Sequence, residues 1–197
     1  SALFYNMFLC KNGVNVFSDP DEEYGLSKEA YYFMGGIMKH IKGMTLINNP
    51  IINSYKRLVP GYNAPVNISW SRKNRTPLMR ITSSGAIGPR IVLRSPDGAS
   101  NPYLVMAACL ACGLEGIKNK IEPPVSQDDI SQDEIAKLDF LPRTLMEAIR
   151  EFEKDTFLQN VLGKSVSELF IARKSDEWSE FCQQVTTWEV EKYLNQI

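Results

Sequence analysis

The sequence contains a single histidine, His40, and only four cysteines among its 197 residues. Zinc sites draw on several histidine or cysteine side chains, so this scarcity argues against a zinc centre. Cys109 and Cys112 have the spacing of half a zinc or redox site, but no second cysteine pair accompanies them. Their neighbours are alanine and leucine, so we expect both thiols to pack in the core. The scattered cysteines suit reduced thiols and predict a cytoplasmic protein.

An excess of charge and long apolar runs are also absent. The net charge of −1 provides no electrostatic attraction to nucleic acid or to an anionic membrane, so neither partner is expected. The longest apolar run, from Tyr103 to Leu114, is far shorter than the ~20 residues of a membrane-spanning helix. No charged-then-apolar leader opens the sequence, so no secretory signal is expected. With 44% hydrophobic residues, we expect residues 1–197 to form a single domain.

Local patterns indicate strands and helices in turn. Alternating residues at the start predict strand structure within residues 1–17. A helix is expected over residues 27–47, with Ser27 as its N-cap and Asn48-Asn49-Pro50 as its end. On this helix, we interpret His40 as a surface or packing residue rather than a ligand.

Alternating residues in the middle of the chain predict short strands within residues 65–95. A helix over residues 101–118 is apolar on almost every side and is expected to be buried across the sheet. Residues 121–141 are acidic and bounded by prolines, which favours an exposed connector. Helices are then expected within residues 144–193.

The sequence therefore predicts an α+β fold, with a short, mostly antiparallel sheet covered by helices and a helical C-terminal third. The sheet would come from residues 1–17 and 65–95, and the covering helices from residues 27–47, 101–118 and 144–193.

Residues 53–65, Asn-Ser-Tyr-Lys-Arg-Leu-Val-Pro-Gly-Tyr-Asn-Ala-Pro, are the most unusual stretch. Cations, aromatics, prolines and a glycine in one segment are typical of a fixed loop that presents charge. Residues 75–80, Arg-Thr-Pro-Leu-Met-Arg, and residues 89–97, Pro-Arg-Ile-Val-Leu-Arg-Ser-Pro-Asp, follow in that order. The three motifs together resemble the C-terminal half of the glutamine synthetase catalytic domain. The resemblance extends from Lys11 to the last predicted helix.

This resemblance implies an ATP-dependent glutamate–ammonia ligase that uses Mg²⁺ or Mn²⁺ and works in nitrogen metabolism. By resemblance, Arg57 would bind the amino-acid carboxylate and Arg94 the reacting carboxyl group. Arg75 and Arg80 would face the nucleotide phosphates, and Arg90 would flank the adenine. Arginine suits these tasks because its planar fork pairs with carboxylate or phosphate through two bonds. A single arginine is more often a surface charge, but five in the family's order favour an inherited anion site.

Several positions depart from the family pattern. Phe4 stands where the family has a metal-binding histidine, and Val92 where it has a metal-ligating glutamate. Neither side chain has a lone pair for a divalent cation. Phe8 stands at a nearby position where the family commonly supplies a serine hydroxyl to the nucleotide. Asn63 replaces the glutamate that helps to bind and deprotonate ammonium, and an amide cannot take up a proton near neutral pH. We therefore expect no tightly bound cofactor; ATP and Mg²⁺ or Mn²⁺ are implied by the family alone.

Two functions from different classes remain open. The first is a piece of a glutamine-synthetase-type ligase that is impaired or inactive by itself and binds ATP and glutamate-like molecules weakly. The family's remaining metal carboxylates and its N-terminal β-grasp domain are not in this sequence. The second is a non-catalytic paralogue that binds a ligand, or regulates or assembles with a glutamine-synthetase-like partner subunit or with itself. A third reading is a helical packing module whose arginines bind nothing.

Two further features bear on regulation. Residues 121–141 contain no tyrosine, so the adenylylation known in the family is not expected here. Residues 188–197 resemble the tail of the Gram-positive-like branch of the family, in which such tails take part in feedback control and contact regulators.

Overall fold

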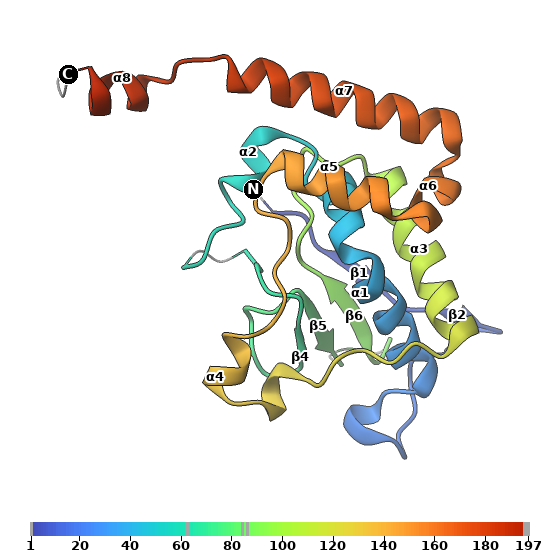
Figure 1. Ribbon diagram of the computed structural model, residues 1–197. Coiled ribbons are helices and arrows are strands. Elements are labelled where there is room, and N and C mark those ends of the chain that lie inside the picture. The colour runs from blue at the N-terminus through green and yellow to red at the C-terminus, as the bar shows by residue number, and fades with distance from the viewer. Residues whose placement is uncertain (1, 62–63, 84, 86, 195–197) are drawn as a thin grey trace.

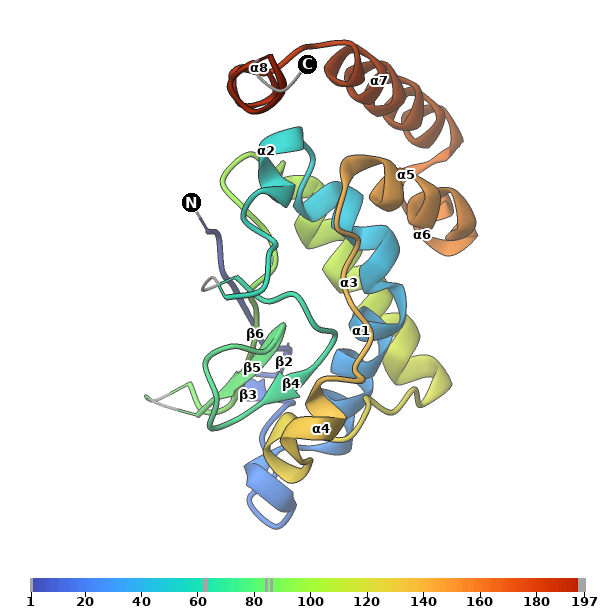
Figure 2. The ribbon, with the colours of Figure 1, turned by 60° about the vertical axis from the view of Figure 1, so that its left-hand side comes forward.

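The computed structural model describes residues 2–61, 64–83, 85 and 87–194. Its centre is the long helix α1 (Lys28–Asn48), with a small sheet to one side and the helix α3 (Pro102–Asn119) packed along it (Figures 1 and 2). The structure confirms the predicted α+β class. No helix in the described part of the chain is long and apolar enough to cross a membrane.

The main sheet has four strands in the order β1-β6-β5-β4. Its strands are β1 (Tyr5–Met7), β6 (Arg90–Leu93), β5 (Met79–Thr82) and β4 (Trp70–Ser71). The pairs β1–β6 and β5–β6 are antiparallel, whereas β4 pairs with β5 in parallel. The sheet is therefore mixed, although antiparallel pairs predominate as predicted.

The strands are shorter than the alternating sequence suggested. Beyond β1, the strands β2 (Cys10–Lys11) and β3 (Val14–Asn15) form a separate two-stranded sheet. Residues 66–69 do not form a regular strand, because their backbone bonds to the connector instead. Ile68 N donates to Asp139 O at 2.7 Å, and Leu141 N donates to Val66 O at 2.8 Å.

The main sheet has one buried and one more open face. Met79, Ile81, Ile91 and Leu93 are at most 2% exposed and belong to the hydrophobic core. Side chains alternate along a strand, so the residues between them lie on the opposite face. That opposite face, called the outer face below, carries the side chains of Asn6, Arg80, Thr82, Arg90, Val92 and Arg94.

The helix α1 begins where the sequence predicted. The Ser27 hydroxyl accepts a hydrogen bond from Ala30 N at 3.2 Å, which caps the helix. Its contact with α3 is a backbone contact: a Cβ added at Gly36 would lie 2.1 Å from the Cys112 carbonyl oxygen. Glycine is therefore required at this crossing, and this closeness explains why α3 packs on α1.

The helix α3 is buried on one face only, contrary to the expectation that it would be buried all round. Val105, Ala108 and Cys112 are fully buried. Tyr103 and Met106 are 82% and 60% exposed, because the other face of α3 has no covering element in the described part of the chain. Its main contact is with α1 rather than across the sheet.

The last third is helical, as predicted. Thr144 caps α5 (Leu145–Lys154) and Asp155 caps α6 (Thr156–Leu162), each by accepting from a backbone N–H. The helix α7 (Lys164–Cys182) follows, and α8 (Thr187–Tyr193) continues beyond the body of the molecule (Figure 1). Thr186 caps α8. The shorter helical segments are η1 (Glu23–Gly25), α2 (Ile52–Tyr55), η2 (Gln127–Asp129) and α4 (Gln132–Ile135).

Candidate functional site

A row of paired residues crosses the outer face of the sheet. Asn6 pairs with Val92, and Val92 pairs with Arg80, so their side chains project to the same side. Val92 is 7% exposed yet lies outside the continuous hydrophobic core. Its neighbours on this face are therefore polar or charged, and the strand pairing sets their spacing.

Three guanidinium groups gather at this face. Burial lowers the pKa of Arg94, and the positive charges of Arg80 and Arg57 lower it further. Such an effect requires the three cations to lie close together. The Nε atoms of Arg57 and Arg80 are buried and have no hydrogen-bond partner within the described residues. Clustered cations with unused donors suit an anionic oxygen ligand.

Backbone carbonyl groups next to the strands hold two of these arginines. Arg57 Nη2 donates to the Ser95 carbonyl oxygen, and Asn49 Nδ2 donates to the same oxygen at 2.9 Å. Arg94 Nη1 donates to the Pro77 carbonyl oxygen at 3.0 Å. The Asn49 contact was missed from the sequence, where Asn48-Asn49-Pro50 signalled only a helix end.

A buried carboxylate supports the same region. Asp97 is 5% exposed, and its carboxylate Oδ1 accepts from Ala99 N at 2.9 Å. Burial lowers the pKa of Arg57, and the charge of Asp97 acts in the opposite direction. Asp97 therefore stabilises the charged form of Arg57 without filling the outer face. Nothing in the sequence pattern singled out Asp97.

The remaining predicted site residues lie at different places. Arg90 begins β6 on the same face as Val92. Arg75 is exposed on the loop after β4, and no contact within the described ranges ties it to the three arginines. Asn63 lies outside the described residues, so its predicted place near the arginines stays a prediction.

Phe4 and Val92, the two positions at which the resemblance predicted replaced metal ligands, both lie on or beside the outer face. The Phe4 ring lies 5.4 Å from the guanidinium carbon of Arg94, within range of a cation–π contact. Val92 lies between Asn6 and Arg80. No group of three or more His, Cys, Asp or Glu side chains in the described part of the chain could hold a metal ion. The residues present therefore do not fit the Mg²⁺ or Mn²⁺ that the family implies.

The lone histidine belongs to a separate cluster. His40 Nδ1 lies 2.7 Å from Asp155 Oδ2, and its Nε2 lies 2.7 Å from Glu115 Oε2. Burial disfavours the charged imidazole and lowers its pKa, but the hydrogen bonds to Asp155 and Glu115 outweigh this, so the pKa of His40 is raised. His40 is 6% exposed and stacks on Phe157, so its interpretation as a packing residue is confirmed. Its two acidic partners were not foreseen.

The cysteine pair is also part of the core, as predicted. Cys109 and Cys112 are at most 1% exposed and are free thiols. Burial raises the pKa of Cys109 to about 12, so the reactive thiolate form is suppressed.

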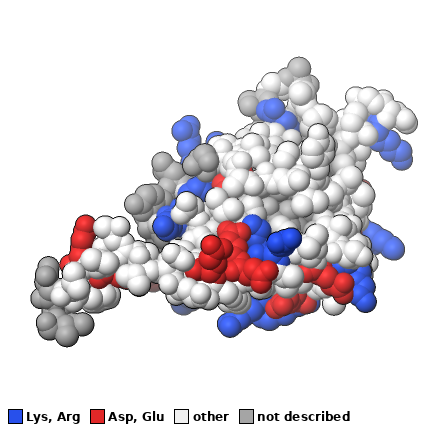
Figure 3. Space-filling view, turned by 90° about the horizontal axis from the view of Figure 1, so that it is seen from above, with Lys and Arg blue, Asp and Glu red and all other residues white. Residues whose placement is uncertain are grey.

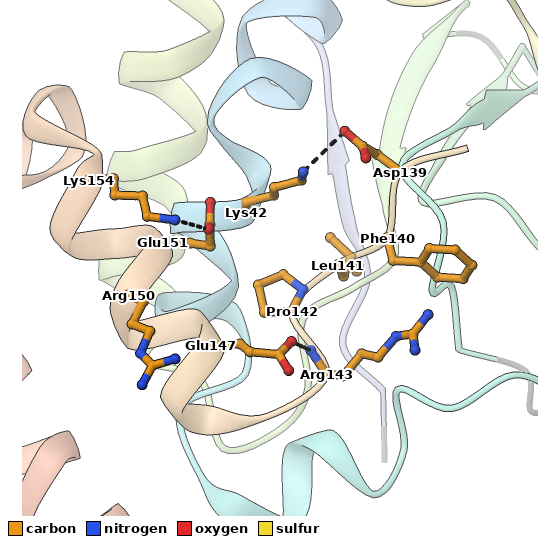
Figure 4. A pocket seen from close by; sticks show the side chains of 10 residues that line it. All are labelled: Lys42, Asp139, Phe140, Leu141, Pro142, Arg143, Glu147, Arg150, Glu151 and Lys154. Carbon is orange, nitrogen blue, oxygen red and sulfur yellow. Dashed lines mark hydrogen bonds and ion pairs between the residues drawn. The ribbon is translucent and has the colours of Figure 1, made fainter. Parts of the chain in front are cut away.

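A cavity of about 440 Å³ lies between α1, α5 and the segment that leads into α5 (Figure 4). Its charges are largely paired: Lys42 contacts Asp139 at 3.1 Å, and Lys154 contacts Glu151 at 2.7 Å. On the face seen in Figure 3, basic and acidic side chains likewise lie next to one another. The arginine cluster of the outer face is the stronger candidate for an anion site, because the buried Nε atoms of Arg57 and Arg80 have no hydrogen-bond partner within the described residues.

Two solved structures have a fold similar to that of this chain. A GmaS/ADP complex matches with a TM-score of 0.86 and 36% sequence identity, over 98% of this chain and 46% of that chain. A GmaS structure without ligand matches with a TM-score of 0.79 and 39% identity, over 93% of this chain and 42% of that chain.

Curated glutamine synthetase sequences are also similar to this chain over almost its whole length. The glutamine synthetase of Clostridium saccharobutylicum is 44% identical over 99% of this chain and 45% of its own length. That of Thermotoga maritima is 45% identical over 98% of this chain and 46% of its own length. This chain therefore spans about half the length of the curated relatives it matches. The family model of the glutamine synthetase catalytic domain matches residues 1–193, and the chain belongs to the glutamine synthetase family.

Proposed function

We propose that this chain is the anion-binding part of a glutamine-synthetase-type site that does not catalyse metal-assisted ligation by itself. Its ligands are ATP and glutamate-like carboxylates, bound weakly. The observation that carries the proposal is that Arg80 and Arg94 share the outer face with Val92, a residue without metal-binding atoms, while Arg57 bonds to the carbonyl of Ser95, the residue after Arg94.

The reaction chemistry explains why binding would persist without turnover. Phosphoryl transfer from ATP depends on divalent cations that bridge the phosphates and neutralise developing charge. Phe4 and Val92 offer no ligand to such a cation. Asn63 cannot accept a proton from ammonium, and a missing proton-transfer group costs on the order of 10² to 10⁴ in rate. The guanidinium groups keep their charge regardless of these losses.

Turnover tests this proposal directly. ADP release would be measured with glutamate, ammonium, ATP and Mg²⁺ or Mn²⁺, on this chain and on the longest natural polypeptide that contains it. We expect no ammonium-dependent ADP release from this chain. Sustained release that requires the metal would contradict the proposal.

Binding of the anion is tested by substitution. Arg80→Gln removes a guanidinium from the outer face and should weaken ATP binding about tenfold, because charge-assisted hydrogen bonds are lost. Arg150→Gln makes the same chemical change at an exposed position of α5, beside the cavity of Figure 4 and not on the outer face of the sheet, and should leave binding unchanged. Equal effects of the two variants would show that the outer face is not the binding site.

A second candidate function is assembly with a glutamine-synthetase-like partner subunit or a regulator. It is favoured by α8, whose Trp188, Tyr193 and Leu194 are at least 50% exposed. Exposed aromatic and apolar side chains on one short helix are typical of contact surfaces. Removal of residues 185–197 should abolish association with such a partner while leaving ATP binding intact. Unchanged association would exclude this function for α8.

The expected location follows from the cysteines. All four are free, and two of them, Cys10 and Cys182, are exposed. Exposed free thiols persist in a reducing compartment, and we therefore assign the protein to the cytoplasm.

A further inference from the structure

An acidic residue of the connector, Asp128 in η2, holds the start of the loop between β4 and β5. Its Oδ1 accepts a hydrogen bond from the Ser71 hydroxyl at 2.6 Å. Its Oδ2 accepts from the backbone N–H groups of Arg72 and Lys73, at 2.8 and 3.2 Å. These partners lie 55 to 57 positions from Asp128 along the chain. One carboxylate therefore fixes the end of β4 and the first two loop residues from a distant segment.

The hydrogen bonds continue through the loop to both neighbours of Arg75. Ser71 Oγ accepts from Asn74 N at 2.7 Å. Asn74 Oδ1 in turn accepts from the N–H and from the hydroxyl of Thr76, each at 3.0 Å. Asn74 and Thr76 stand immediately before and after Arg75 in the sequence. The backbone on both sides of Arg75 is therefore held, although its side chain is exposed.

The carboxylate of Asp128 is a strong acceptor in these bonds. Burial raises the pKa of Asp128, but hydrogen bonds from Ser71 and from the N–H groups of Arg72 and Lys73 lower it by more. The charged form is therefore favoured. Hydrogen bonds to an ionised carboxylate are shorter and stronger than those between neutral groups. Loss of this charge should loosen the start of the loop.

Both ends of the loop reach the arginines of the outer face. At its start, Ser71 pairs with Arg80 across β4 and β5, so the two side chains project to the same side of the sheet. Near its end, the Pro77 carbonyl oxygen accepts from Arg94 Nη1 at 3.0 Å. The loop that carries Arg75 is therefore joined to two members of the proposed anion site.

We propose that Asp128 is a positioning residue for ATP binding, which acts through Ser71, Asn74 and Thr76 to hold Arg75 where its guanidinium meets the nucleotide phosphates. This inference rests on the proposed function, which supplies the nucleotide. Asp128 does not itself bind the ligand, because its negative charge would repel phosphate. A loop that is already ordered loses less conformational freedom when Arg75 binds, so more of the interaction energy appears as affinity.

Replacement of Asp128 separates positioning from simple electrostatics. Asp128→Asn removes a negative charge, which by itself would favour a bound anion. It also sets an amide NH₂ group against the N–H donors of the loop, so the contacts at residues 71–73 are lost. We expect ATP binding, measured by NMR titration without metal, to weaken about fivefold. Glutamate binding should change less than about twofold, because Arg57 bonds to the Ser95 carbonyl oxygen outside the loop.

Asp129→Asn is the matched control, since it removes the same charge from the adjacent position. Its carboxylate accepts from the Tyr24 hydroxyl at 3.4 Å and makes none of the loop contacts in the described part of the chain. We expect ATP binding to stay within about twofold of the unchanged chain. Asn74→Ala, at an exposed position, breaks the same series of bonds further along the loop. It should weaken ATP binding as Asp128→Asn does, and it keeps the test valid if Asp128→Asn does not fold.

A double variant tests whether Asp128 acts through Arg75. Arg75→Gln alone should weaken ATP binding, and Asp128→Asn added to it should weaken binding no further, because the positioned group is already gone. Effects of the two substitutions that multiply would overturn the inference. So would ATP binding that is unchanged or tighter in Asp128→Asn and Asn74→Ala, and so would equal weakening by Asp128→Asn and Asp129→Asn.

The same titrations distinguish this inference from the proposed function. If Arg80→Gln leaves ATP binding unchanged, the anion site is wrong and the role of Asp128 is wrong with it. If Arg80→Gln weakens ATP binding while Asp128→Asn does not, the anion site stands and the positioning role alone is wrong.

Discussion

At the scale of single residues, the outer face combines arginines with Phe4 and Val92, which stand at two positions where we predict metal ligands in the family. The Phe4 ring lies 5.4 Å from the guanidinium carbon of Arg94, and Val92 pairs with Arg80. Neither side chain has an atom that could bind Mg²⁺ or Mn²⁺. Both positions lie in or next to a regular strand, so the backbone is compatible with side chains that do carry such atoms.

This compatibility predicts a gain of function. Phe4 and Val92 are diagonal neighbours on adjacent strands, so Phe4→His together with Val92→Glu should bring an imidazole and a carboxylate within reach of one ion. We expect Mn²⁺ affinity, measured by electron paramagnetic resonance, to rise at least about tenfold over the unchanged chain. Each single variant should give a smaller gain, because one ligand binds more weakly than two. No gain in the double variant would place these residues outside metal-binding distance.

At the scale of elements, the contact of α1 with α3 depends on glycine. A Cβ at Gly36 would lie 2.1 Å from the Cys112 carbonyl oxygen, whereas a Cβ at Gly43 would meet side-chain atoms at 3.0 Å or more. Backbone atoms cannot move aside without shifting a helix, but side chains can adjust. Gly36 and Gly43 of α1 therefore differ in whether an added methyl group can be accommodated.

Gly36→Ala should lower the free energy of unfolding by about 3 kcal/mol, because the new methyl group overpacks the helix crossing. Gly43→Ala, on the same helix, should change it by less than about 1 kcal/mol, since alanine's better helix propensity offsets the tighter contact. Chemical denaturation of both variants measures the difference. Equal destabilisation would contradict the close approach of α1 and α3.

The cluster around His40 predicts how stability depends on pH. The folded pKa of His40 lies above its usual value of 6.5, so its charge stabilises the fold below that pH and the contribution is lost as pH rises through the folded pKa. Asp155 and Glu115 face the imidazole from α6 and α3, and Lys39 contacts Glu115 at 2.7 Å.

Burial raises the pKa of Glu115, but hydrogen bonds from Lys39 and His40 lower it by more. The stabilising effect of Glu115 is therefore present above its usual pKa of 4.5 and is lost in acid. Between about pH 6 and about pH 9, the unfolding free energy should fall in the unchanged chain and stay flatter in His40→Gln. Denaturant titrations at both pH values measure this. Parallel pH profiles would contradict a charged His40 in the fold.

Local signals in the sequence were sufficient to predict where several helices begin. Ser27, Thr144 and Asp155 mark helix starts because a capping side chain bonds within its own turn. The His40 cluster could not be predicted, because its partners Glu115 and Asp155 lie 75 and 115 residues away along the chain. The exposed face of α3 was missed because an apolar pattern shows that a face needs cover, not where the cover is.

The candidate site was predictable to a similar degree. The family resemblance predicted that Arg80, Arg90 and Arg94 belong to one site; the β5–β6 pairing puts them on one face of the sheet, and their binding roles stay predictions. The buried support from Asn49 and Asp97 had no sequence signal, because it arises where the end of α1 meets the segment after β6.

At the scale of the whole molecule, the fold brings together the three arginines that we propose as an anion site. Arg57 follows α2, Arg80 lies in β5 and Arg94 follows β6, so only the folded chain can place them side by side. The central claim is that these cations bind anions without help from a metal ion.

Isothermal titration calorimetry with ATP, carried out with and without Mg²⁺, measures this claim most directly. A pocket of guanidinium groups without metal ligands should bind ATP with a dissociation constant on the order of 1 mM, changed less than about threefold by Mg²⁺. Micromolar affinity that appears only when Mg²⁺ is added would contradict the account.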